Sequence, residues 1–280
     1  MTRRIDWLPH VILLLGVGIV AFPIYVTLVA STLPVADIVH GPMPLVPGGE
    51  AARSYGDALF IGSSNLRSGA IVSRMLLNSL VMAVVIAVGK IAISIISAYA
   101  VVFFRFPLRS VFFWMIFVTL MLPVEVRIMP TYKVVADLGM VDTYWGLTIP
   151  LIASATATLL FRQFFLTIPD EMVEAAKIDG AGPLRFFWDT VLPLSLTNIA
   201  ALFVILFIYG WNQYLWPLLV TNSTSMMTIV IGIRTLLGGG DAQTEWNLVM
   251  ATTVLAMLPP IAVVVLMQRW FVKGLVDSEK

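Results

Sequence analysis

The sequence predicts an all-α integral membrane protein with six transmembrane helices and both chain ends in the cytoplasm. Hydrophobic residues make up 59% of the 280 residues and charged residues 12%, whereas soluble domains carry about 25% charged residues. Six apolar stretches are each long enough to cross a hydrocarbon core of about 30 Å as a helix. Their uniform apolar character excludes barrel strands, so helices are the only spanning form that fits.

The expected spans follow one another within a single transmembrane domain, residues 1–280. Arg3 and Arg4 precede the first stretch, as in a signal peptide, but the stretch is longer than the 7–15 apolar residues typical of such signals. We therefore expect an uncleaved span, followed by an external loop rich in Pro and Gly, residues 32–73. The spans are predicted at about residues 9–31, 75–104, 110–131, 143–161, 194–220 and 248–268.

The distribution of Lys and Arg predicts the orientation, because cytoplasmic segments carry the excess of these residues. With the N-terminus inside, ten lie on the inside and five on the outside. The inside set is Arg3, Arg4, Arg105, Arg109, Arg162, Lys177, Arg185, Arg269, Lys273 and Lys280. The outside set is Arg53, Arg67, Arg74, Lys133 and Arg234. The segment around residues 169–193 is then cytoplasmic.

Composition argues against an enzyme. The net charge is +1, so nothing favours nucleic-acid binding, and membrane lipid is the expected surroundings. The chain has no cysteine, and His10 and His40 lie far apart, so no metal site is expected. It contains no Gly-x4-Gly-Lys-Ser/Thr motif for cradling nucleotide phosphates. Any ATP and Mg²⁺ would be bound by partner subunits, and we expect no cofactor in this chain.

A short polar segment between the fourth and fifth spans is predicted to form two helices separated by a glycine. Pro169 suits a first helical turn, and Gly180 suits the position just after a helix end. A second short helix would carry Phe186, Phe187 and Trp188. These aromatic side chains either lie on lipid as an interfacial helix or insert into a groove on a partner.

Charged residues within spans are candidates for function because charge is costly at membrane depth. Lys90 lies roughly 22 Å from cytoplasmic Arg105 at 1.5 Å per residue. By the same rise, further polar and aromatic residues fall near that level. We interpret the set as a solute cavity. The alternatives are an interfacial aromatic belt, with Lys90 either paired with Glu125 or snorkelling. The candidates are Lys90, Glu125, Arg127, Trp211, Asn212, Tyr214 and Trp216.

The polar segment resembles the EAA loop of permease subunits of ABC importers. In that pattern Glu-Ala-Ala is followed by Gly after three residues and by Ile-x-Leu-Pro after nine more. Glu174, Ala175, Ala176, Gly180 and Leu192-Pro193 match it, while Thr190 replaces the isoleucine. The resemblance implies a type I importer permease fold and an ATPase-coupling loop at residues 169–193. The implied coupling residues are Glu174, Ala175, Ala176, Gly180, Phe186 and Phe187.

The resemblance extends over most of the chain, to the carbohydrate-uptake branch that includes maltose permeases and glycerol-3-phosphate importers. Leu122–Arg127, Ala153–Thr158, Tyr209–Pro217 and the tail Gly274–Lys280 carry it. It implies a permease for glycerol-3-phosphate or glycerophosphodiesters in the bacterial inner membrane. The implied partners are a homologous second permease, two ATP-binding subunits and a periplasmic binding protein. The implied contacts with the binding protein are Gly238, Gly239, Gly240 and Asp241.

Three alternatives remain open from the sequence. A permease of the same branch could import a neutral sugar or a polyol. A stand-alone secondary transporter would use Lys90 and Glu125 as a gate or proton relay. A membrane scaffold would use its aromatic residues for packing alone. The cytoplasmic helix–glycine–helix segment argues against the secondary transporter, which has no need of an ATPase contact.

Overall fold

The computed structural model describes residues 7–62, 71–237 and 244–277, and these are helical with no β-strand among them. They divide into two compact units. The first unit comprises Met1–Leu76 and Ile229–Leu258, and the second comprises Leu77–Thr228 and Pro259–Lys280. The long helices α4 (Val72–Phe103) and α15 (Trp246–Asp277) contribute residues to both.

The first unit begins with α1 (Trp7–Ala30), a 24-residue apolar helix. Short helices form the segment that was expected as an external loop: α2 (Val35–Val39), α3 (Ala51–Gly56) and the π-helix η1 (Asp57–Ile61). Hydrogen bonds fasten this segment to the end of α1. The Tyr25 hydroxyl donates to the Leu45 carbonyl at 2.6 Å, and Gly48 N–H donates to Thr32 Oγ1 at 2.8 Å. The unit also contains α14 (Ile229–Leu236).

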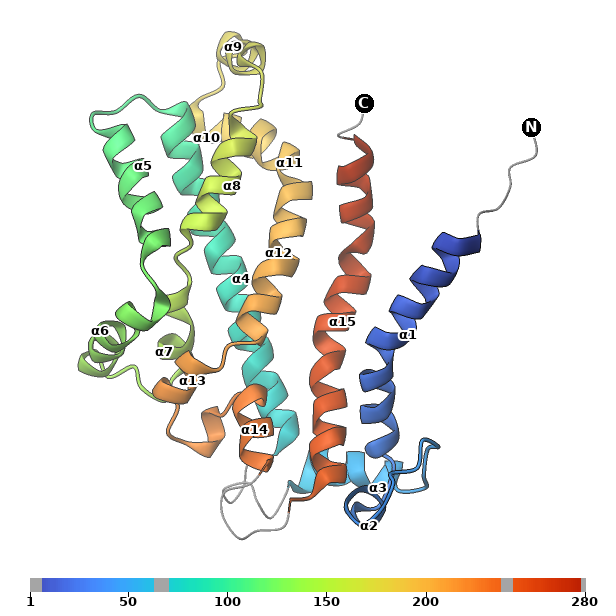
Figure 1. Ribbon diagram of the computed structural model, residues 1–280. Coiled ribbons are helices and arrows are strands. Elements are labelled where there is room, and N and C mark those ends of the chain that lie inside the picture. The colour runs from blue at the N-terminus through green and yellow to red at the C-terminus, as the bar shows by residue number, and fades with distance from the viewer. Residues whose placement is uncertain (1–6, 63–70, 238–243, 278–280) are drawn as a thin grey trace, which may run out of the picture. The chain divides into compact units, whose positions relative to one another are not determined.

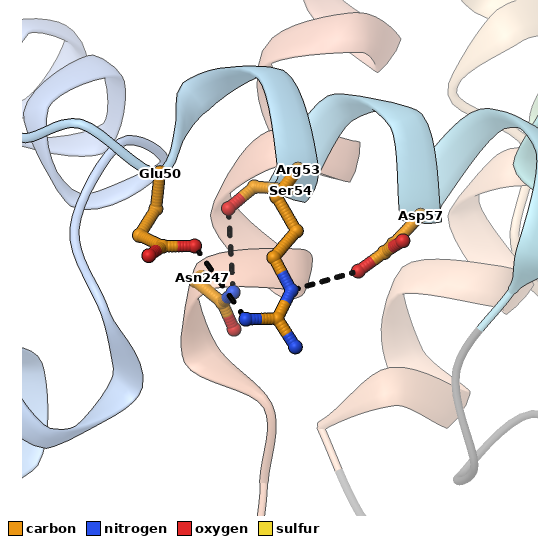
Figure 2. A network of polar contacts seen from close by, with 5 residues as sticks. All are labelled: Glu50, Arg53, Ser54, Asp57 and Asn247. Carbon is orange, nitrogen blue, oxygen red and sulfur yellow. Dashed lines mark hydrogen bonds and ion pairs between the residues drawn. The ribbon is translucent and has the colours of Figure 1, made fainter.

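A polar network joins α3 to the start of α15 within the first unit (Figure 2). Asn247 Nδ2 donates to Ser54 Oγ at 3.3 Å. Arg53 lies between Glu50 and Asp57, at 3.8 Å from a carboxylate oxygen of each. These ion pairs are solvent-exposed, so each adds at most about 1 kcal/mol to stability.

The second unit is built around α4, which runs from end to end of it (Figure 1). Its longer helices are α5 (Arg109–Val118), α6 (Val124–Asp137), α8 (Ala155–Phe165), α9 (Asp170–Ile178) and α12 (Leu196–Trp211). Its shorter elements are η2 (Thr119–Met121), α7 (Tyr144–Thr148), η3 (Ile149–Leu151), α10 (Pro183–Phe186), η4 (Phe187–Val191), α11 (Leu192–Leu194), α13 (Leu215–Val220) and η5 (Thr224–Met226).

Three of the stretches expected as spans are broken rather than continuous helices. Pro123, with an extended ψ of 144°, separates α5–η2 from α6. The fourth stretch bends by 47° between η3 and α8, where the Ser154 side chain accepts the Ala157 N–H and starts a new helix. The fifth ends at Trp211 and resumes as α13 at Leu215. A proline in the third stretch and a helix-capping serine in the fourth therefore divide segments that a hydropathy profile treats as single spans.

In the described residues, three helices are long and apolar enough to cross a membrane, or up to five if each bent pair counts as one span. The three are α1, α4 and residues Trp246–Gln268 of α15. Pro259 and Pro260 lie inside α15, which continues through them. The end of α15 reaches Asp277, well beyond the expected boundary near residue 268.

Close packing fixes α4 against two neighbours in the second unit. A Cβ added at Gly210 of α12 would lie 2.9 Å from Ala83 Cα, and one at Gly89 would lie 2.7 Å from Ile152 Cγ2. Small residues let helix backbones approach this closely in membrane proteins. The core beside this contact is apolar, and its buried members are Met82, Ile86, Ile128, Val135, Leu147, Trp216, Val220 and Met226.

Candidate functional site

A cavity of about 180 Å³ lies among α4, α6, η3, α12 and α13 of the second unit. Both charged residues that line it are cations, Lys90 and Arg127. Polar groups come from Thr131, Tyr209 and Gln213. No acidic side chain is among the described residues of the lining. The breaks after Pro123 and Trp211 turn α6 and α13 so that they can line the cavity.

The two cations of this cavity have different surroundings. Lys90 is 7% exposed, and its Nζ lies 3.8 Å from the centre of the Tyr209 ring, a cation–π contact. Arg127 is exposed and lines the same cavity. Neither residue belongs to an ion pair in the described part of the chain. The cavity therefore holds positive charge that the described side chains do not neutralise.

The aromatic candidates separate into lining and core. Trp216 lines the cavity, and its indole N–H donates to the Gly146 carbonyl at 3.1 Å. Trp211 is buried and stacks on Phe207, with ring centroids 5.8 Å apart. Both indoles are buried by this chain, so neither presents its ring at the surface of the chain.

The remaining candidates lie away from the lining described for the cavity. Asn212 is exposed at the end of α12, and Tyr214 is exposed just before α13. Glu125 lies in the first turn of α6, but its side chain is outside the described part, so the Lys90–Glu125 pair stays untested. Tyr209 and Thr131 were absent from the expected site. Tyr209 lies on α12, and Gln213 follows the end of that helix and donates through Nε2 to the Tyr209 carbonyl at 3.2 Å.

Hydrogen bonds join the elements beside the cavity. Asp142 adopts a left-handed φ of 57°, and its Oδ1 accepts the N–H groups of Asn222 at 2.6 Å and Ser223 at 2.8 Å. The Ser223 hydroxyl donates to the same oxygen at 3.1 Å. Partial burial raises the pKa of Asp142, but these hydrogen bonds outweigh it and hold the pKa below its ordinary value.

Asn78 of α4 extends this network. Its Nδ2 donates to the carbonyls of Ser225 and Met227, both at 2.9 Å, and its Oδ1 accepts from the Tyr144 hydroxyl at 2.6 Å. The side chain is fully buried, so each of these bonds replaces one that water would otherwise make. Together Asn78 and Asp142 tie α4, α7 and the segment after α13 into one block, which we call the hydrogen-bonded block.

The predicted EAA segment forms α9, a glycine turn and α10–η4. Gly180 has φ of +70°, its N–H donates to the Lys177 carbonyl, and the Ala181 N–H donates to the Ala176 carbonyl at 2.8 Å. This pair of bonds is the Schellman arrangement that ends helices at a left-handed residue. The structure confirms Gly180 as the helix stop. A groove of about 300 Å³ follows the turn, lined by residues that include Ala175, Ala176 and Arg185.

The partner-groove interpretation expected the aromatic residues of this segment to face outward. They do not all do so. Phe186 is 6% exposed and packs edge-on against Phe103 of α4, with ring centroids 5.4 Å apart. The ring centroids of Phe187 and Tyr99 are 5.0 Å apart, and the Tyr99 hydroxyl donates to the Pro183 carbonyl at 2.7 Å. Trp188 remains 61% exposed. Phe186 therefore attaches the segment to α4 and is covered by this chain itself.

Comparison with known proteins places this geometry in a family. Residues 90–277 match the family described as "Binding-protein-dependent transport system inner membrane component". This chain belongs to that family. It is 65% identical over 271 residues to the sn-glycerol-3-phosphate transport system permease protein UgpE of Rhizobium meliloti (strain 1021), covering 97% of this chain and 96% of the relative. The corresponding protein of Yersinia enterocolitica is 59% identical over 278 residues, covering 99% and 98%.

The fold is shared with a solved structure. A chain in the crystal structure of a bacterial ABC transporter involved in the import of the acidic polysaccharide alginate matches with a TM-score of 0.80 and 21% identity, covering 97% of this chain and 99% of that one. The predicted all-α permease fold is confirmed. Membership of the family also confirms the inner-membrane location and a transport component rather than an enzyme.

Two parts of the expected site lie outside what the structure describes. Gly238, Gly239, Gly240 and Asp241, the expected contacts with a binding protein, fall in residues 238–243. The tail beyond Asp277 does so as well, and the side chains from Arg269 onward are not described. Glu174 lies exposed on α9, where the EAA pattern predicts a surface residue.

Proposed function

We propose that this chain is the permease subunit through which a binding-protein-dependent ABC importer moves sn-glycerol-3-phosphate across the bacterial inner membrane. The observation that carries the proposal is the identity of 65% over 97% of the chain to a permease protein of an sn-glycerol-3-phosphate transport system. The subunit works with a homologous permease, two ATP-binding subunits and a periplasmic binding protein that delivers the substrate.

The α9–η4 segment is the part that contacts the ATP-binding subunits in this proposal. Its most exposed large apolar side chains are Ile178 at 85%, Leu184 at 76% and Trp188 at 61%. Apolar side chains on a short helix are suited to a groove on a partner. The coupling set is Glu174, Ala175, Ala176, Gly180, Phe186 and Phe187, with Phe186 and Phe187 transmitting movement to α4 through Tyr99 and Phe103.

The substrate pathway in this proposal passes the cavity beside Lys90. Closure of the ATP-binding dimer moves the coupling segment, and the membrane helices exchange inward-open and outward-open states. Trp216 and Tyr209 present ring surfaces suited to a carbon skeleton, and Gln213 and Thr131 present polar groups suited to hydroxyls.

ATP hydrolysis by the reconstituted importer tests this function. The assay uses the two permeases, the ATP-binding subunit and the binding protein, with and without sn-glycerol-3-phosphate, and a loaded maltose-type binding protein as control. We expect stimulation by the glycerol-3-phosphate-loaded protein alone. Stimulation with a neutral sugar or polyol instead would move the substrate class, and transport by this chain without an ATPase would contradict the proposal.

A further inference from the structure

We propose that the cavity beside Lys90 is a subsite for a phosphomonoester dianion, and that its two cations select a monoester over a phosphodiester or a neutral polyol. This inference rests on the proposed function and adds to it a basis for selectivity within the membrane subunit. It uses four residues of the second unit: Lys90, Arg127, Tyr209 and Gln213.

The first argument is the state of Lys90. Only 7% of this residue is exposed, and the described lining offers it the Tyr209 ring but no carboxylate. A buried ammonium is costly unless an opposite charge or hydrogen-bond acceptors accompany it. The cation–π contact with Tyr209 offsets part of this cost. An anion entering the cavity would supply acceptors beyond those of the described lining.

The second argument is the presence of Arg127 on the same cavity. Lys90 and Arg127 line the same cavity, and two like charges that face one space repel each other. A group with two negative charges relieves this repulsion more completely than a group with one. A phosphomonoester carries about −1.5 to −2 charge at pH 7, whereas a diester carries a single negative charge.

The third argument is geometric. Arg127 is exposed, whereas Lys90 is enclosed, so the two cations lie at different depths of the cavity. Arginine offers a planar fork that suits phosphate oxygens, and lysine offers a compact charge. Gln213 Nε2 donates to the Tyr209 carbonyl at 3.2 Å, which leaves its amide oxygen as an acceptor for a hydroxyl. A volume of about 180 Å³ lies below the 300–1,000 Å³ of pockets for larger ligands, so it fits a small solute.

The test compares Arg127→Gln and Lys90→Met with Lys133→Gln in the assembled importer. Lys133 lies exposed on the same helix as Arg127 but is not among the lining residues, which makes it a matched control. One measurement is the thermal stabilisation of the detergent-solubilised complex, without binding protein, by sn-glycerol-3-phosphate, a glycerophosphodiester and glycerol. The other is ATP-driven uptake of sn-glycerol-3-phosphate into proteoliposomes.

We expect the monoester to stabilise the wild type and Lys133→Gln, and the diester to do so less. Arg127→Gln and Lys90→Met should lose the preference for the monoester, and uptake should fall by about tenfold or more, since each charge-assisted hydrogen bond is worth about 1.5–3 kcal/mol. Lys90→Arg, which keeps the charge, should retain part of the preference.

The outcomes separate this inference from the proposed function. Equal preference and uptake in Arg127→Gln and Lys133→Gln, with normal stimulation of ATP hydrolysis by loaded binding protein, would overturn the subsite alone. Absence of that stimulation in the wild type would overturn the proposed function. If Lys90→Met fails to assemble, Arg127→Gln decides the matter, because Arg127 is exposed.

Discussion

At one end of the second unit, hydrogen bonds hold α7 and the segment after α13, whereas at the other end aromatic rings hold the α9–η4 segment to α4 (Figure 1). In the hydrogen-bonded block, the Asn78 and Asp142 side chains have their hydrogen-bond partners within the chain. The coupling segment leaves Leu184 and Trp188 exposed. The hydrogen bonds of the first region are made within the chain. The exposed apolar side chains of the second region are suited to contact with a partner protein.

The largest effect is expected from Asn78→Ala in the hydrogen-bonded block. The change removes the donor to the buried Met227 carbonyl, and it also removes a partner of the part-buried Ser225 carbonyl and Tyr144 hydroxyl. A buried group left unsatisfied costs about 1–3 kcal/mol. We expect a loss of more than about 2 kcal/mol in stability, measured by thermal unfolding of the assembled complex. Asn212→Ala, at an exposed position, is the control. Equal unfolding temperatures for Asn78→Ala and Asn212→Ala would show that the hydrogen-bonded block does not stabilise this end of the unit.

A substitution at Gly180 tests the coupling segment at its turn. Valine at a φ of +70° is strained by about 1–2 kcal/mol, so Gly180→Val should lower ATP-driven uptake by roughly 5–30-fold. Membrane insertion, measured by the amount of protein in the membrane fraction, should not change. Gly182 has an ordinary φ of −69° and open space for a side chain. If Gly182→Val lowers uptake as much, the left-handed turn is not the cause.

A smaller effect is expected at Asp142. Its folded-state pKa lies below the ordinary value, so the ionised carboxylate stabilises the fold above its unfolded-state pKa. That stabilisation is lost as the pH falls through the folded-state pKa. Asp142→Asn should cost about 1 kcal/mol near neutral pH and should flatten the acid limb of the unfolding temperature against pH. An unchanged acid limb would mean that other carboxylates set it.

The smallest effect is expected from removing one exposed ring of the coupling segment. Trp188→Ala should reduce the stimulation of ATP hydrolysis by loaded binding protein by about tenfold or less, because a single interface side chain commonly contributes 1 kcal/mol or little more. Trp114 of α5 is matched, since it is 59% exposed and also forms an edge-to-face pair with a neighbouring Phe. Similar losses in Trp188→Ala and Trp114→Ala would remove the contact role.

The sequence predicted features that depend on neighbouring residues better than contacts between residues far apart in the chain. The stop at Gly180 depends on one turn of helix, and its glycine indicates it directly. The shared level of Lys90 and Arg127 followed from helical rise along separate stretches. The contact of Asp142 with Asn222 joins residues 80 positions apart, and no local pattern reports it. The break between η2 and α6 lies at Pro123, and a proline is a local signal that the sequence shows directly.

The close approach of Gly210 to Ala83 has a consequence for how movement in this protein can be followed. Tyr209 precedes this contact on α12, and Lys90 follows Ala83 by seven residues, close to two turns of α4. Backbones in contact cannot roll past each other without a clash, so these two helix segments provide a fixed internal reference. Distances from spin labels elsewhere in the chain to labels on this pair would then report the displacement of the labelled element alone.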